Sequence, residues 1–479
     1  MSERPSKSAA VELGAPRPVC VAVAVALGAL LALAPGASSA TPARTPALHQ
    51  EPRGIGQLVA PRDRVEIAYT VDSPRIAAPT GWLLVRSDRG ARFARLPFRR
   101  KGRTLSAVVP TRLVRGGRLV YRAVVRDRRS GRSITSATSS AWILRDPVDV
   151  RLDVHRFGHP RKPDAVVARA RAAGVGWQLP EPGQGPSFGP QTFVVARDRT
   201  VWLDDGLNNR LLAWRPSRPN AVTRTVPLPE RSADHDVAIG RTGAIYVTGT
   251  VGRGLDAHHV LYRIDPNGRV RWQTRLAEER ESQTSFLLGA NSPLRLGPDG
   301  TLYCLAGMPG LPGGEPAWMP VATPSGRPLT VAAQRQRTRW PYQPVAGGLR
   351  LVSEVYTAKP DTAPHEARYA LIDRGGRLVR SWRVRSRTAI NFNYATPELV
   401  GGDPVVVLDV TAGTNRTRKW EYLVLRLGAH GVRTRFSLSR AVFGDNLLAD
   451  VRIGPDGNLY QLASSPTAGV TIGRFSLGR

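Results

Sequence analysis

Short runs in which apolar and polar residues alternate recur along most of the chain, and each run is bounded by Gly, Pro, Asn or Asp. Alternation with a period of two is typical of half-buried β-strands. The clearest unit, residues 235–275, contains two hairpins, with turns at Thr242-Gly243 and at Asn267-Gly268. No stretches with a helical period of 3.6 residues alternate with these strands, so the pattern predicts an all-β protein.

The first hairpin of this unit returns further along the chain, as PLRLGPDGTLYCL at 293–305 and as VRIGPDGNLYQLA at 451–463. The turns of six such copies lie at Arg199, Gly243, Gly300, Gly348, Gly402 and Gly457. The turns of the second hairpins interleave with them, at Asn220, Gly268, Gly326, Gly376 and Gly431. A four-stranded unit repeated about every fifty residues is typical of a β-propeller, so residues 188–479 are expected to form six blades.

The sixth blade lacks a second hairpin, which would leave an unpaired sheet edge. We therefore expect an N-terminal strand to complete the propeller. Residues 174–180 are the first candidate for this strand, and residues 148–157 are the second. Residues 147–187 are accordingly predicted to be a linker that also contains a short helix, from an Asp164 cap to Gly174.

Six further strand-like runs lie between residues 55 and 146, and their number and spacing predict an antiparallel β-sandwich. In the run LVYRAVVRD, Tyr121, Ala123 and Val125 share one face, while Arg122 and Arg126 share the other. The run resembles the penultimate strand of immunoglobulin-like and fibronectin type III-like domains, where a Y-x-A-x-x-x-D pattern precedes the last hairpin.

The first propeller copy, FVVARDRTVWLDDGLNNRLLAW, resembles the D-x-x-N-x-R-I segment of NHL-type repeats. The residues that carry the likeness are Asp204, Asp205, Gly206, Asn208, Asn209 and Arg210. The later GPDG hairpins also resemble those of gluconolactonase-like and TolB-like six-bladed propellers. This resemblance implies that Asp204 and Arg210 form a structural ion pair between neighbouring strands.

The first forty residues are typical of a secretory signal peptide. Arg4, Lys7 and Arg17 precede an apolar run at 19–34, and small residues lead to a cleavage site after Ala40. Residues 41–54 are rich in Pro, Ala and Thr and are expected to form a flexible leader. The mature protein is therefore predicted to be secreted or held in the cell envelope, with no transmembrane span.

Composition adds a large positive charge, since 69 Lys and Arg residues face 37 acidic ones. Only five of the 69 are Lys, a bias that GC-rich bacterial codon usage produces whatever the partner. Of the two cysteines, only Cys304 follows the signal peptide, so no internal disulfide is expected. The sequence also contains no His-Glu-x-x-His or phosphate-loop motif, and no catalytic residue is assigned.

Three functions remain open. The first is a non-catalytic binding or scaffold protein that recognises a protein or polysaccharide at one mouth of the propeller channel. Its candidate residues lie just before or within the innermost strands: Gln191, His235, Asp236, Asn291, Gln343, Asn393, Tyr394, Asp445 and Asp450.

The second is a metal-dependent lactonase-like or lyase-like enzyme, which the propeller resemblance implies. Its Ca²⁺ or Mg²⁺ would be held in the channel by oxygen ligands from four blades, Asp236, Asn291, Asn393 and Asp450.

The third is a binder of anionic cell-wall polymer or extracellular nucleic acid. Residues 55–146 hold 20 basic and six acidic residues, so the charge is densest there. The candidate contacts are Arg99, Arg100, Lys101, Arg103, Arg126, Arg128 and Arg129.

Overall fold

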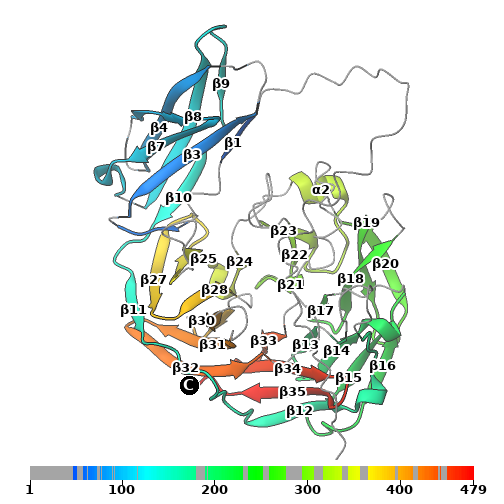
Figure 1. Cartoon of the computed structure of the whole chain (residues 1–479). Helices are drawn as coiled ribbons and strands as arrows, with labels where there is room; N and C mark the ends of the chain where they lie inside the picture. Colours follow the sequence, from blue (N-terminus) through cyan, green and yellow to red (C-terminus); the bar gives the residue numbers. More distant parts are fainter. Residues whose placement is uncertain are drawn as a thin grey trace, which may run out of the picture. The chain divides into compact units, whose positions relative to one another are not determined.

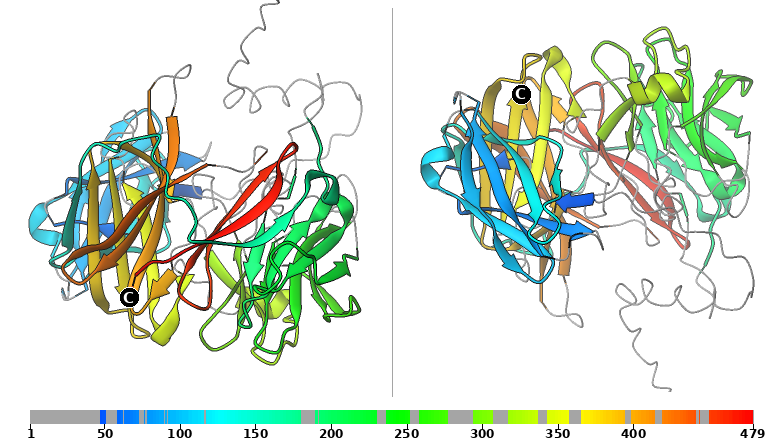
Figure 2. Two further views of the ribbon diagram at one scale, coloured as in Figure 1. Left: turned by 90° about the horizontal axis from the view of Figure 1, so that it is seen from below. Right: turned by 90° about the horizontal axis from the view of Figure 1, so that it is seen from above.

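The computed structural model shows an all-β chain, in which the described residues form eight separate sheets of three to six strands (Figure 1, Figure 2). It describes residues 47–50, 58–61, 63–72, 76, 78–88, 90, 92–115, 117–179, 189–190, 192–229, 236–251, 258–276, 294–306, 317–336, 343–356, 365–393, 398–413, 419–440, 443 and 450–478. These strands belong to one compact unit, residues 46–412 and 419–479. The predicted signal peptide lies outside the described residues. None of the described helices is long and apolar enough to cross a membrane.

Two sheets form the N-terminal module, residues 58–143 with β1 added. The first contains β1 (Ala47–Gln50), β3 (Val65–Asp72), β7 (Thr104–Val109) and β6 (Arg99–Lys101). The second contains β2 (Leu58–Val59), β10 (Ser139–Ile143), β8 (Arg118–Asp127), β4 (Pro79–Ser87), β5 (Ala94–Pro97) and β9 (Ser133–Thr135). The 3₁₀ helix η2 (Thr111–Leu113) follows β7. β1 lies within the predicted flexible leader, where it pairs with β3 instead of remaining unstructured.

The two sheets of this module bury one common core. The alternating inward positions of β3 and β7 supply Ile67 and Ala107, and those of β4 and β8 supply Leu83 and Tyr121. The outward positions of the same strands are polar or half-buried, as the period of two predicts.

The remaining strands form six sheets in which hairpins follow one another along the chain. The first of these sheets contains β13 (Phe193–Val195), β14 (Val201–Asp205), β15 (Arg210–Trp214) and β16 (Arg224–Pro227). The second contains β17 (Val237–Ile239), β18 (Ile245–Val251), β19 (His258–Ile264) and β20 (Val270–Arg275). The third contains β21 (Leu294–Leu296), β22 (Leu302–Ala306) and β23 (Ala317–Ala322). Two 3₁₀ helices, η3 (Ala172–Gly174) and η4 (Gly206–Asn208), and α2 (Val331–Gln336) lie between strands.

The fourth sheet contains β24 (Gln343–Pro344), β25 (Arg350–Tyr356), β26 (Glu366–Ile372), β27 (Leu378–Ser386) and β11 (Val148–Leu152). The fifth contains β28 (Ala389–Asn393), β29 (Glu398–Val400), β30 (Asp403–Ala412), β31 (Lys419–Gly428) and β32 (Gly431–Ser439). The sixth contains β33 (Val451–Ile453), β34 (Leu459–Ser465), β35 (Gly469–Phe475) and β12 (Ala165–Ala170). The 3₁₀ helix η7 (Ala346–Gly348) makes the turn before β25.

The expected hairpin turns are present. All six first-hairpin markers have a positive φ, including Arg199 at 64° and Gly457 at 73°. Positive φ is costly for residues with a side chain, which explains why five of these six positions are Gly. The described second-hairpin glycines, such as Gly268 at 87°, share this geometry.

The expected NHL-like, TolB-like or gluconolactonase-like propeller is wrong, because none of the sheets that the described residues form is closed and these residues show no propeller. Five core clusters join neighbouring sheets in a series from β21–β23 to β24–β27. Among the described residues, no core cluster joins the two ends of this series. The expected resemblance to immunoglobulin-like domains is not supported either. The all-β fold class with several sheets is confirmed.

Both strand candidates for completing the last sheet are also wrong. Residues 148–152 form β11, which pairs in parallel with β27 in another sheet. The strand beside β35 is β12, which Figure 1 shows in teal next to the red strand. The sequence predicts a helix for this segment, but the open edge of β35 and the pockets for Val167 and Ala168 override the helical preference of its alanines.

Candidate binding site

The predicted channel residue Asp236 is buried and its carboxylate is already engaged by the protein. Its Oδ1 accepts hydrogen bonds from Thr192 Oγ1 at 3.0 Å and from the Val237 N–H at 2.9 Å. Its Oδ2 accepts one from the Leu294 N–H at 2.7 Å, and Arg452 forms an ion pair with Oδ1. Asp236 therefore connects residues of four sheets and serves the packing of their first strands.

The other channel candidates are only partly described. Asp450 is buried directly before β33. Gln343 and Asn393 lie in β24 and β28, but their side chains are outside the described residues. The remaining candidates lie entirely outside the described residues: Gln191, His235, Asn291, Tyr394 and Asp445. Within the described part of the chain, no group of three or more His, Cys, Asp or Glu side chains could hold a metal ion.

Two arginines that were not predicted as site residues lie in β21 and β33. Arg295 in β21 pairs with Glu398, and Arg452 in β33 pairs with Asp236. Burial lowers the pKa of Arg295, and the nearby charge of Arg452 lowers it further, against the opposing effect of Glu398. The two arginines occupy the same place in the repeated runs LRLGPDG and VRIGPDG, and this shared place was the signal in the sequence.

The expected ion pair of the first repeat copy has a different acid from the one predicted. Arg210 Nε lies 2.7 Å from Oδ2 of Asp205, not from Asp204. Asp205 also accepts a hydrogen bond from the Gly176 N–H at 2.7 Å. The pair therefore fixes the segment after β12 to β14 and β15, which is a structural role.

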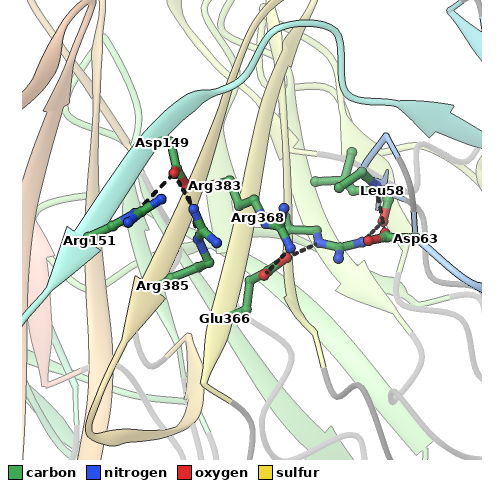
Figure 3. Close-up of polar contacts among 9 residues, drawn as sticks. Leu58, Asp63, Asp149, Arg151, Glu366, Arg368, Arg383 and Arg385 are labelled. Carbon is green, nitrogen blue, oxygen red and sulfur yellow. Dashed lines mark hydrogen bonds and ion pairs between the residues drawn. The ribbon is translucent and has the colours of Figure 1, made fainter.

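A buried charge network joins the N-terminal module to the sheet of β24–β27 (Figure 3). Arg368 in β26 is fully buried, and its Nη1 lies 2.6 Å from Oδ2 of Asp63 and 2.9 Å from the Leu58 carbonyl oxygen. Its Nε donates to Glu366 Oε1 at 2.7 Å, while Arg383 contacts the other oxygen of Glu366 at 2.7 Å.

Glu354 in β25 completes the same joint. Its Oε2 accepts a hydrogen bond from the Leu58 N–H at 2.8 Å. Burial raises the pKa of Glu354 to about 7, although this hydrogen bond and Arg368 both lower it. Trp142, Leu144, Val352 and Ile372 add an apolar cluster to the joint, so this region holds the module in place.

The predicted polyanion contacts are exposed, but the structure divides them between two sheets. Arg99, Arg100 and Lys101 form the edge strand β6, and Arg103 follows in the turn. Arg126 is the next-to-last residue of β8 in the other sheet, and Arg128 and Arg129 lie in the turn after it.

A larger basic surface covers the outward face of the second sheet. In the ladder of β4 and β8, Trp82 is opposite Val124, and Leu84 is opposite Arg122. Residues opposite each other in an antiparallel ladder project to the same side. The intervening residues, such as Leu83 and Tyr121, fill the core, so these positions face outward.

Arginine and aromatic side chains stack on this face. The Arg95 guanidinium lies 4.1 Å from the ring centroid of Trp82. Arg86 and Arg122 lie 4.8 and 5.3 Å from the centroid of Phe93. We name this surface the arginine–aromatic face and define it by Trp82, Arg86, Phe93, Arg95, Arg122 and Arg126.

Among the described residues, no acidic side chain on this surface balances the arginines. The described outward positions of β4, β5 and β8 contain no Asp or Glu, and none of the four arginines of the face has an ion pair within the described part of the chain. The alternation in LVYRAVVRD indicated Arg122 and Arg126, but their neighbours come from other strands, which spacing along one strand does not reveal. The face can therefore attract an anion by charge and by arginine hydrogen bonds.

Comparisons with known proteins leave the family open. No family model matches the chain, and no curated protein matches it. Among solved structures, a DUF4784 family protein from Bacteroides caccae is similar at 10% identity, over 90% of this chain and 95% of that one, with a TM-score of 0.21. A tetra-tandem repeat in the extending region of a large adhesion protein is similar at 11% identity, over 91% and 100%, with a TM-score of 0.18. Scores this low carry no argument about fold or function.

Proposed function

We propose that the protein is a non-catalytic binding protein of the cell exterior, and that its N-terminal module recognises an anionic polysaccharide of the cell envelope. The arginine–aromatic face carries this proposal. Four arginines, with no Asp or Glu among the described outward positions of their sheet, present donors for carboxylate, phosphate or sulfate groups spaced along a polymer.

The module itself is proposed to be a two-layer β-sandwich spanning residues 55–146. The common core of its two sheets supports this arrangement, because both sheets bury their alternating apolar positions against each other. A sandwich leaves the outer surface of each sheet free, and in the second sheet that surface carries the arginine–aromatic face.

The stacking geometry favours a polysaccharide over a nucleic acid. Guanidinium groups already cover the Trp82 and Phe93 rings, so the covered ring surfaces are closed to nucleobases. Single-stranded nucleic acids gain much of their affinity from bases stacking on exposed aromatic rings. A polymer recognised through its charged groups alone makes better use of this face.

The proposal is tested by titrating the protein with heparin, as an anionic polysaccharide probe, and with single-stranded oligo-dT. The triple variant Arg86→Glu, Arg95→Glu and Arg122→Glu should bind heparin at least tenfold more weakly than the wild type. The matched control is Arg215→Glu, Arg218→Glu and Arg224→Glu, which makes the same charge change at exposed positions elsewhere. This control should keep its affinity within about threefold.

Two outcomes would contradict the proposal. Equal losses in both triple variants would show that net charge, and not the face, attracts the polymer. Tighter binding of oligo-dT than of heparin at equal ionic strength would assign the face to nucleic acid. The melting temperature of each variant is measured beside that of the wild type, so that a loss of affinity can be distinguished from a loss of folding.

A further inference from the structure

A second basic site lies far along the chain from the arginine–aromatic face. The segment between β11 and β12 crosses the strands β31 and β32, and the two enclose an open groove of about 1080 Å³. Asp153, Arg156 and His159 line the groove from this segment, and Arg435 and Phe436 line it from β32. Arg387, between β27 and β28, also lines it. This volume lies just above the usual range for small-molecule sites.

The wall of the groove is firmly anchored. Oε1 of Glu421 in β31 accepts a hydrogen bond from the Gly158 N–H at 2.5 Å. Oε2 of Glu421 lies 2.7 Å from Nε2 of the buried His155. The backbone N–H of His155 donates to Thr388 Oγ1 at 2.7 Å. The N–H of Arg161 donates to the Ser437 carbonyl oxygen at 2.8 Å. A surface segment held at both ends in this way presents its side chains in a fixed arrangement.

Three of the groove's cations remain uncommitted. Arg161 already donates to the Ser476 carbonyl oxygen and to Asp164, and its guanidinium lies over the Phe436 ring. In contrast, the guanidinium groups of Arg156, Arg387 and Arg435 are exposed and have no ion pair or hydrogen bond with the described residues. Among the described residues of the lining, Asp153 is the one acidic residue.

We infer that this groove binds a small organic anion that carries two or more phosphate or carboxylate groups. Arg156, Arg387 and Arg435 bind the anionic groups, because a guanidinium donates two parallel hydrogen bonds to either group. The exposed Val154 contacts the uncharged body of the ligand. The groove is independent of the arginine–aromatic face and of the function proposed for it.

Isothermal titration of the full protein with tripolyphosphate and with citrate, at about 150 mM salt, tests this inference. The triple variant Arg156→Gln, Arg387→Gln and Arg435→Gln should lose at least tenfold in affinity for whichever probe binds. The control Arg215→Gln, Arg218→Gln and Arg224→Gln removes the same charge and should stay within about twofold. Preference for tripolyphosphate or for citrate identifies the anionic group.

Hydrogen exchange gives a second readout, in which the bound probe should slow exchange in residues 153–161 and 431–439. Absence of binding by both probes at 1 mM would overturn the inference, as would equal losses in the two triple variants. The triple Glu variant at Arg86, Arg95 and Arg122 should keep wild-type affinity for the small anion. Failure of the heparin experiment therefore leaves this result unaffected.

Discussion

Arg368 and Asp63 lie far apart in the sequence, yet their side chains meet in a buried ion pair with 2.6 Å between Nη1 and Oδ2. The side chain of Arg368 is 1% exposed and that of Asp63 is 10% exposed. A charge pair removed from water in this way stabilises the protein only while both partners are present.

We expect Arg368→Met to destabilise the protein by about 3–5 kcal/mol, because the substitution leaves Asp63 and Glu366 buried without their shared cation. Denaturant unfolding measures this change. The control is Arg385→Met, which breaks the half-exposed pair with Asp149 that is also drawn in Figure 3. It should cost less than about 1 kcal/mol, and equal effects would show that the buried joint contributes no more than a surface pair.

Glu354 should make stability fall as the pH rises through about 7. Its pKa is raised to about 7 in the folded protein, so between pH 4.5 and 7 the folded state keeps a proton that the unfolded chain has released. Glu354→Gln stays neutral throughout. Relative to the wild type, its unfolding free energy should therefore increase between pH 5 and pH 9, by roughly 2–3 kcal/mol.

Asp127 supplies a control of opposite sign for this pH experiment. Its hydrogen bond from Ser130 lowers the pKa of Asp127 to about 2, helped by the N–H groups of Ala78 and Ser130. Its stabilising contribution is complete above pH 4 and is lost only as the pH falls toward 2. The difference between Asp127→Asn and wild type should thus be constant from pH 5 to 9, and a constant difference for Glu354→Gln as well would refute the prediction.

Asp236→Ala should destabilise the fold by several kcal/mol, because Arg452 then loses its partner and the N–H of Leu294 loses its acceptor. Thermal unfolding of the variant measures the loss. Asp265→Ala, which breaks an exposed pair with Arg271, serves as the comparison and should cost less than about 1 kcal/mol. A small effect at Asp236 would mean that the first strands do not depend on this carboxylate.

Gly469→Ala tests the pairing of β12 with β35. At Gly469, φ is +82° and an added Cβ would lie 2.2 Å from the Ala170 carbonyl oxygen. Gly243 has a φ of +79° but open space around it, so Gly243→Ala isolates the backbone cost of about 1–2 kcal/mol. The Gly469 variant should lose clearly more in chemical denaturation. Equal losses would argue that β12 does not lie against this turn.

Local signals carried most of the strand pattern. Turn residues such as Gly243 and Gly457 are required by the backbone itself, so the hairpins could be located from the sequence alone. Pairings between distant segments have no such local requirement. The sequence of β12 alternates poorly and is rich in alanine, and only the open edge of β35 makes it a strand.

The candidate sites show the same division. Asp236 could be placed next to a strand, but the sequence did not reveal that Arg452 and Leu294 use up its carboxylate. Likewise, Arg122 could be assigned to an outward face, whereas its neighbour Phe93 comes from a different part of the chain. Chemistry that depends on two or more strands becomes visible only when their register is known.

The pairing of β12 with β35 also sets an order for events during synthesis. Ala165 pairs with Arg474, so the ribosome makes one strand long before it makes the other. Until β35 emerges, β12 has no partner of its own and its backbone groups can pair with a second nascent chain. The last sheet can therefore form only after residues 469–475 have been made.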